Sequence, residues 1–173
     1  MGLAEQGRDS LLVEQDPHRL AALVDGRIPF HEPSLPEAHA IQHAAGRIVP
    51  SAEIPRGGPD LMLVCVGTPI DEAGSTDLSQ VARVLDEAVP AIAPGAACVI
   101  RSTLPVGSAA RLANRPGLVP GWLFVAPEFL RRGSALHDIR RPTRVVVGTF
   151  GAQHHEPAAP AGLPGPPVRS LTS

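Results

Sequence analysis

The chain has 173 residues, of which 43% are hydrophobic, and a formal net charge of −2 at pH 7. This length and composition predict a globular domain with a sizeable core and exclude disorder throughout. The lack of net positive charge argues against a nucleic-acid partner, and no stretch approaches the roughly 20 apolar residues of a membrane helix. Because the first ten residues lack a secretory signal pattern, we expect a cytoplasmic protein.

Short apolar runs and amphipathic stretches alternate along the chain. Asp16-Pro17 is typical of a helix start and Gly26 of a helix end, and Asp77 is placed to cap a later helix. The residues predict helices over 17–25, 33–45, 78–91 and 108–114, and strands over 10–13, 48–51, 61–66, 97–100, 122–125 and 144–147, the last closed by Gly148. This order indicates a doubly wound α/β fold with a parallel sheet, in which the continuous run at 61–66 is buried on both faces.

The last segment differs in composition from the rest of the chain. Residues 150–173 are rich in Pro, Gly and Ala, which predicts a disordered tail after one domain over residues 1–149. A polyproline ligand is the alternative for this tail.

The cysteine and histidine residues give little indication of a metal or redox site. Cys65 and Cys98 lie within apolar runs, so we expect buried, reduced strand residues rather than a disulfide. His39 and His43 have the spacing of metal ligands on a helix, but no third ligand accompanies them, and no metal site is predicted.

Glu14 follows the first strand, where a carboxylate can accept hydrogen bonds from both ribose hydroxyls of an adenosine and repels a 2′-phosphate. The position therefore favours NAD over NADP, the alternative being a solvated acid. Arg19, one turn into the next helix, is a candidate contact for the phosphates of the cofactor or else a surface residue.

Two turns follow the strands predicted at 61–66 and 97–100. Gly67, Thr68 and Pro69 form a turn that lets the backbone approach a flat ligand. Ser102 and Thr103 place two hydroxyls after the next strand, suited to the ribose and nicotinamide end of a dinucleotide. Because such strand ends hold ligands in open α/β sheets, the pair of turns predicts a cofactor site.

Glu128 lies between Pro127 and the apolar residues Phe129 and Leu130. Partial desolvation there would suit the carboxyl to acid–base work. The alternative is a salt bridge to Arg131 or Arg132, and the residues alone leave both interpretations open.

Taken together, the runs Val66–Ile70, Ser102-Thr103 and Glu128–Arg132 resemble the nucleotide-sugar 6-dehydrogenases, the family of UDP-glucose and GDP-mannose dehydrogenase. The resemblance covers residues 1–149 and includes the segment Glu14 to Arg19. It implies a Rossmann-like NAD-binding domain of an oxidoreductase that oxidises the C6 alcohol of a nucleotide sugar to the acid. It implies cofactor contacts at Glu14, Arg19, Val66, Gly67, Thr68, Pro69, Ser102, Thr103 and Arg132, substrate contacts at Glu128, Phe129, Leu130 and Arg131, and a catalytic role for Glu128.

The sequence also departs from the family pattern. Ala126 stands where the family has Asn, and Arg132 stands where it has an acid. The family's first strand with its GxGxxG turn would precede Gly2, and its nucleophilic cysteine and assisting lysine have no counterpart here. We therefore expect an incomplete sheet and a chain that is inactive alone. The alternatives are a non-catalytic fragment that pairs with a full-length relative and, less favoured, a different NAD-dependent hydroxyacid dehydrogenase.

Overall fold

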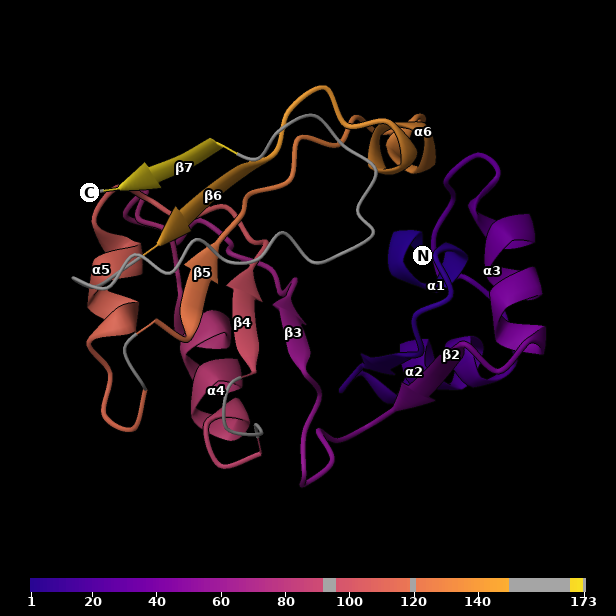
Figure 1. Cartoon of the computed structure of the whole chain (residues 1–173), viewed down its shortest axis with the longest axis horizontal. Helices are drawn as coiled ribbons and strands as arrows, with labels where there is room; N and C mark the ends of the chain where they lie inside the picture. Colours follow the sequence, from indigo (N-terminus) through magenta and orange to yellow (C-terminus); the bar gives the residue numbers. More distant parts are fainter. Residues whose placement is uncertain (92–95, 119–120, 150–168, 173) are drawn as a thin grey trace. The chain divides into compact units, whose positions relative to one another are not determined.

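A computed structural model describes residues 1–91, 96–118, 121–149 and 169–172. They belong to two compact units: unit 1 is Met1–Ile54 with Phe129–Thr143, and unit 2 is Pro55–Glu128 with Arg144–Ser173. Figure 1 shows the elements in sequence colours. In the part of the chain that the structure describes, no helix has the length and apolar character needed to cross a membrane.

Unit 1 contains a small parallel sheet and four helices. Its elements are α1 (Gly2–Glu5), β1 (Ser10–Val13), α2 (Pro17–Val24), α3 (Leu35–Ala44), β2 (Ile48–Ser51) and α6 (Ala135–Arg140). Strand β1 pairs with β2 in parallel, and both α2 and α3 contact β2. Asp16 caps α2 as its residue type predicts, because its carboxylate accepts the N–H of Arg19 at 2.9 Å and Pro17 occupies the first turn.

Helices α1 and α6 contact each other within unit 1. A Cβ atom on Gly2 would lie 2.6 Å from Cγ2 of Ile139, so only glycine fits at this contact. The guanidinium of Arg140 binds both carboxylate oxygens of Glu5 across the same contact. This ion pair holds the pKa of Glu5 below its usual range.

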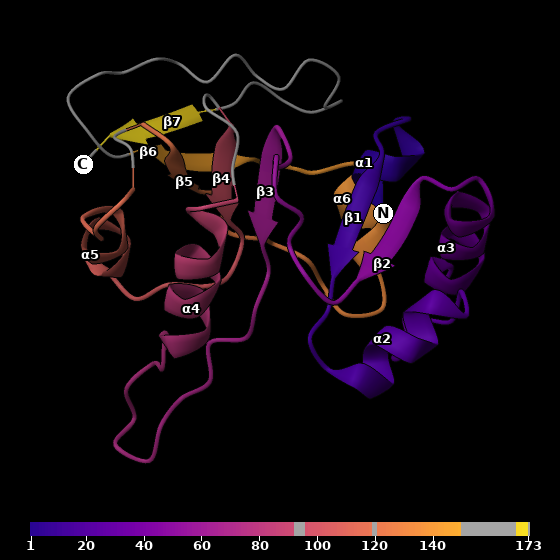
Figure 2. The ribbon, with the colours of Figure 1, turned by 90° about the horizontal axis from the view of Figure 1, so that it is seen from below.

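Unit 2 is built on a five-stranded sheet in the order β3-β4-β5-β6-β7. Its elements are β3 (Leu61–Val64), α4 (Ser79–Ala88), β4 (Ala97–Ile100), α5 (Ser108–Ala113), β5 (Leu123–Val125), β6 (Val146–Thr149) and β7 (Arg169–Thr172). Strands β3, β4 and β5 are parallel, β6 runs antiparallel to β5, and β7 is parallel to β6. Helices α4 and α5 lie on the same face of the sheet (Figure 2). Val81 and Leu85 of α4, with Cys98 and Ile100 of β4, are completely buried.

The α/β architecture with mostly parallel strands is confirmed, but several details of the prediction are wrong. Strand β3 ends at Val64, two residues before the end of the apolar run, and Leu63 is 42% exposed, so the strand is not buried on both faces. The last predicted strand begins two residues later, at Val146, and includes Gly148 instead of ending there. Helix α6 has no counterpart in the prediction, because its six residues carry too short a pattern.

The predicted tail is only partly described. Residues 150–168 and 173 lie outside the described residues, whereas Arg169–Thr172 form β7, where the composition predicts no strand. The division into residues 1–149 and 150–173 stays a prediction.

Candidate functional site

The carboxyl ends of β3, β4 and β5 meet at one edge of the sheet in unit 2, because the three strands are parallel and adjacent. The N–H of Arg101 donates to the carbonyl of Val64 at 2.8 Å, and the hydroxyl of Ser102 donates to the carbonyl of Val66 at 2.7 Å. The loop after β4 is therefore bound to the loop after β3. These bonds bring together two of the predicted cofactor segments.

The turn after β3 has free space beside the backbone of Gly67. A Cβ atom on Gly67 would come no closer than 3.8 Å to another group, Oε1 of Gln80. The carbonyl of Pro69 accepts the N–H of Asp77 at 2.8 Å, which anchors the end of the turn. Thr68 follows Gly67, and the side chain of Thr103 is exposed. Backbone and hydroxyl groups at this edge are thus accessible to a ligand.

Glu128 lies three residues after β5, at the same edge, and forms an ion pair with Arg101. Nε and Nη2 of Arg101 both lie close to Oε1 of Glu128, at 3.0 and 2.9 Å. The alternative partners predicted for Glu128 are wrong: Arg131 binds Asp138 instead, through its guanidinium and its backbone N–H. This second pair holds the pKa of Asp138 far below its usual range.

The remaining residues of the candidate substrate segment belong to unit 1. Phe129 is 45% exposed, Leu130 is half-buried, and Arg132 is exposed. Arg131 is also exposed, although Asp138 holds its guanidinium.

Glu14 and Arg19 also belong to unit 1 and flank the N-terminus of α2. Oε1 of Glu14 accepts the N–H of Asp16 at 3.0 Å, so the carboxylate is oriented while keeping acceptor capacity for a ligand. The backbone of Arg19 is bound by Asp16, and its side chain is exposed. Glu14 thus presents a half-exposed acceptor at the carboxyl end of β1.

Glu32 is an important residue that the sequence interpretation did not single out. It is only 6% exposed, and its two carboxylate oxygens accept the N–H groups of Gly133 and Ala135 at 3.0 and 2.8 Å. This carboxylate satisfies the N–H of Ala135, the first residue of α6, and that of Gly133 just before the helix, and so attaches the segment after Glu128 to the rest of unit 1.

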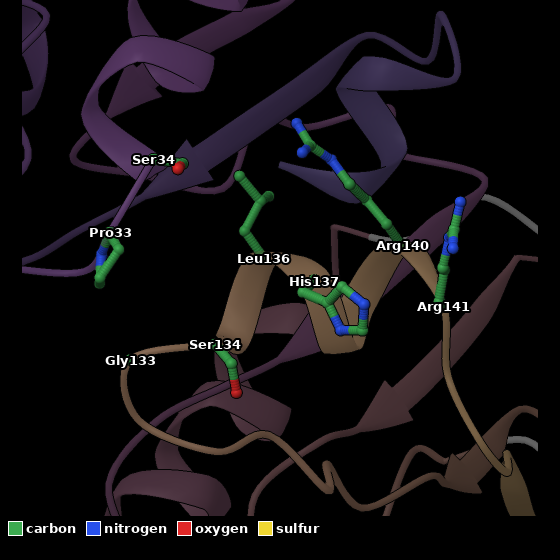
Figure 3. A pocket seen from close by; sticks show the side chains of 8 residues that line it. All are labelled: Pro33, Ser34, Gly133, Ser134, Leu136, His137, Arg140 and Arg141. Carbon is green, nitrogen blue, oxygen red and sulfur yellow. The ribbon is translucent and has the colours of Figure 1, made fainter.

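A pocket of about 400 Å³ lies within unit 1, between the turn at Pro33 and helix α6. Figure 3 shows the side chains that line it: Pro33, Ser34, Gly133, Ser134, Leu136, His137, Arg140 and Arg141. None of the predicted cofactor or substrate residues is among them. Its Arg140 is already paired with Glu5.

The two cysteines differ in their surroundings. Cys98 is buried as predicted, and burial raises the pKa of its thiol to about 12. Cys65 is exposed, contrary to the prediction, because β3 ends one residue before it. Partial burial and the charge of Glu128 raise the pKa of the Cys65 thiol, an effect that Arg101 opposes.

His39 is buried on α3, with Nδ1 lying 3.3 Å from the carbonyl of Gly26 and its ring stacked on that of His43. Within the described residues, Nε2 of His39 lacks a hydrogen-bond partner, and no group of three or more potential metal ligands occurs.

The chain matches the NAD-binding domain of the UDP-glucose/GDP-mannose dehydrogenase family over residues 1–160. It is 36% identical over 163 residues to a UDP-glucose 6-dehydrogenase of Pseudomonas aeruginosa, an alignment that covers 88% of this chain and 36% of that protein. A UDP-glucose 6-dehydrogenase of Rhizobium meliloti is 32% identical, with 86% and 36% covered. The chain thus spans about a third of the length of these relatives.

Solved structures of dehydrogenases are similar to this chain over most of its length. A ternary complex of GDP-mannose dehydrogenase from Pseudomonas aeruginosa superposes with a TM-score of 0.77 at 25% identity, covering 86% of this chain and 37% of that one. A UDP-glucose dehydrogenase from the archaeon Pyrobaculum islandicum gives a TM-score of 0.76 at 30% identity, with 87% and 37% covered.

Proposed function

The chain belongs to the UDP-glucose/GDP-mannose dehydrogenase family, and from this membership we propose that it is the NAD-binding part of an oxidoreductase that converts the C6 alcohol of a nucleotide sugar to the acid. The family's domain binds NAD. The nucleotide-sugar substrate and the oxidation at C6 are the proposed part.

The observation that best supports the proposal is the joining of three strand ends in unit 2. Hydrogen bonds link Ser102 to Val66 and Arg101 to Glu128, so that hydroxyls, open backbone and a carboxylate share one edge of the sheet. When bound, NAD supplies the hydride acceptor. Ser102, Thr103 and the turn at Val66, Gly67, Thr68 and Pro69 would contact it at this edge. Arg132, a residue of unit 1, is proposed as a further cofactor contact from the family resemblance.

The proposed role of Glu14 is to bind the adenosine ribose, with Arg19 near the phosphates. The carboxylate of Glu14 keeps acceptor capacity beyond its bond to Asp16, which suits two hydroxyl donors and disfavours a 2′-phosphate. Glu128 is proposed to exchange a proton with the substrate, while Phe129, Leu130 and Arg131 contact it.

The thiols of this chain are poor candidates for the family's covalent step. Burial raises the pKa of Cys98 to about 12, and the pKa of Cys65 is also raised. Because the thiolate is the reactive form, neither cysteine is suited to attack a sugar aldehyde. We therefore propose that the 173-residue chain alone does not oxidise nucleotide sugars.

Binding of reduced cofactor tests the proposed cofactor site. NADH titrated into the chain should bind more tightly than NADPH, as measured by fluorescence. Glu14→Gln should weaken NADH binding by about tenfold, the cost of one charge-assisted hydrogen bond. Glu37→Gln, at an exposed position of α3, is the matched control and should leave binding unchanged. Absence of NADH binding, or an equal effect of both variants, would contradict the proposed cofactor site.

One observation favours a second candidate, an interaction fragment that pairs with a full-length relative. Leu11, Leu12 and Val13 of β1 are 44%, 39% and 38% exposed, and among the described residues β1 pairs with β2 only. An apolar strand with an unpaired edge can accept another strand. Co-elution of the chain with a full-length relative, lost when Leu12 is replaced by Lys, would support this candidate.

A further inference from the structure

The position of Arg101 is fixed by backbone hydrogen bonds on both sides of β4. Its own N–H donates to Val64 of β3 at 2.8 Å, and the carbonyl of the preceding residue, Ile100, accepts the N–H of Ala126 at 2.9 Å. Arg101 is therefore held between the strand ends that carry the turn after β3 and Glu128. A side chain that starts from such a fixed backbone can orient a partner accurately.

The contact between Arg101 and Glu128 uses one carboxylate oxygen. Nε and Nη2 of Arg101 both bind Oε1, and in the described residues no hydrogen bond to Oε2 is found. The two side chains are 25% and 37% exposed, so the pair is partly shielded from water. Two nitrogens of a planar guanidinium that meet one oxygen fix where Oε1 lies, and they leave Oε2 without a donor among the described residues.

We infer that Arg101 is a positioning residue for Glu128: it holds Oε1 at the edge of the sheet and leaves Oε2 as the oxygen that meets the ligand. This inference rests on the proposed function for the role of Glu128. Neither the family pattern nor the comparisons assign a role to Arg101.

The pKa of the Cys65 thiol can be used to detect the charges of Arg101 and Glu128, because Cys65 follows β3 at the same edge of the sheet. The charge of Glu128 raises the pKa of the Cys65 thiol, and the charge of Arg101 lowers it. Removing either partner should therefore shift the ionisation of Cys65, and the two shifts should have opposite signs. This pattern reports that both charges lie near Cys65, whereas the orientation of Glu128 by Arg101 needs a measurement of its own.

The experiment follows thiolate absorbance against pH in the full chain, with the spectrum of Cys65→Ser subtracted as the blank. Arg101→Met should raise the midpoint of Cys65 and Glu128→Gln should lower it, whereas Arg101→Lys, which keeps the charge, should stay near the wild type. Arg115→Met and Asp86→Asn break another arginine–carboxylate pair of unit 2 and serve as matched controls. They should leave the midpoint unchanged.

Nuclear magnetic resonance then tests the orientation itself. In a ¹⁵N-labelled chain, the Nε–H signal of Arg101, assigned by its loss in Arg101→Lys, should shift in Glu128→Gln and not in Asp86→Asn. The inference would be overturned if Arg101→Met and Glu128→Gln left the midpoint of the Cys65 thiol unchanged, as the controls do. It would also be overturned if the Nε–H signal of Arg101 did not shift in Glu128→Gln. Should Arg101→Met fail to fold, Glu128→Gln and Arg101→Lys still decide the result. Failure of NADH binding would contradict the proposed function without altering these readouts.

Discussion

The carboxylate of Glu32 accepts the backbone N–H of Ala135 at 2.8 Å, so that one buried side chain joins two segments separated by 103 residues. Its other oxygen accepts the N–H of Gly133. Because α6 has only six residues, these two bonds are a large part of what determines where the helix begins.

Replacing Glu32 by Gln should destabilise the chain. The amide keeps one acceptor but presents an NH₂ group to a backbone donor, which leaves a buried N–H unpaired at a cost of about 1–3 kcal/mol. Urea unfolding followed by circular dichroism measures this cost. Glu37→Gln, an exposed change of the same type, should lower the free energy of unfolding by much less. Equal effects of the two variants would show that the capping bonds do not stabilise α6.

Replacing Ser34 by Gly should stabilise the chain. Ser34 has a φ of 62°, in the left-handed region, and its side chain makes no capping hydrogen bond to α3. Glycine removes a steric cost of roughly 1 kcal/mol, partly offset by its greater freedom when unfolded. Thermal unfolding should show a higher midpoint for Ser34→Gly. Ser34→Ala keeps the Cβ atom and should give no increase.

The chain should lose stability on mild acidification because of His39. Burial, and to a smaller extent the charge of the stacked His43, hold the pKa of His39 below its usual range, whereas the bond to Gly26 acts in the opposite direction. Between the lowered pKa of His39 in the folded chain and its ordinary value of about 6.5, the unfolded state therefore binds more protons than the folded state. The contribution of His39 to the free energy of unfolding is complete above about pH 6.5 and falls as the pH drops toward the folded-state pKa.

Unfolding free energies measured between pH 5 and 8 test this dependence. His39→Leu should flatten the curve over this range, whatever its effect on absolute stability. His18→Asn changes an exposed histidine on α2 and should leave the slope as it is in the wild type. A slope that persists in His39→Leu would assign the pH dependence to other groups.

Replacing Gly2 by Ala should destabilise the contact between α1 and α6. The new Cβ atom would lie 2.6 Å from Cγ2 of Ile139, a β-branched side chain with little freedom to move away. Overpacking of this kind costs about 1–3 kcal/mol. The double variant Gly2→Ala with Ile139→Ala should lose less stability than the sum of the two single changes, because the second change removes the clashing methyl group.

Local signals in the sequence predicted most of the elements but not their tertiary partners. Asp16 and Pro17 determine where α2 begins through contacts within four residues, so their pattern is visible in the chain itself. Helix α6 is too short to show a helical pattern, and its start depends on Glu32, about a hundred residues earlier, so the local sequence does not indicate it. The predicted range of strand β3 is two residues too long, because an apolar run does not show where the hydrogen bonds between strands stop.

The candidate site illustrates the same limit. The sequence places Glu128 after a strand, as the structure does, but it offers only the nearby Arg131 and Arg132 as partners. The actual partner, Arg101, is 27 residues away and directly follows the neighbouring strand. Comparing residues that follow adjacent predicted strands, rather than residues close in sequence, would have indicated it.

The discontinuity of unit 1 has a consequence for synthesis on the ribosome. Its first segment ends at Ile54, and its second, which includes α6, begins only at Phe129. With chain growth at roughly 5–20 residues per second, the nascent β1–β2 segment waits several seconds before Gly133 and Ala135 emerge to meet the carboxylate of Glu32. During that interval unit 1 lacks α6 and the two hydrogen bonds that Glu32 accepts from this later segment, and a chain released before Gly133 never forms them.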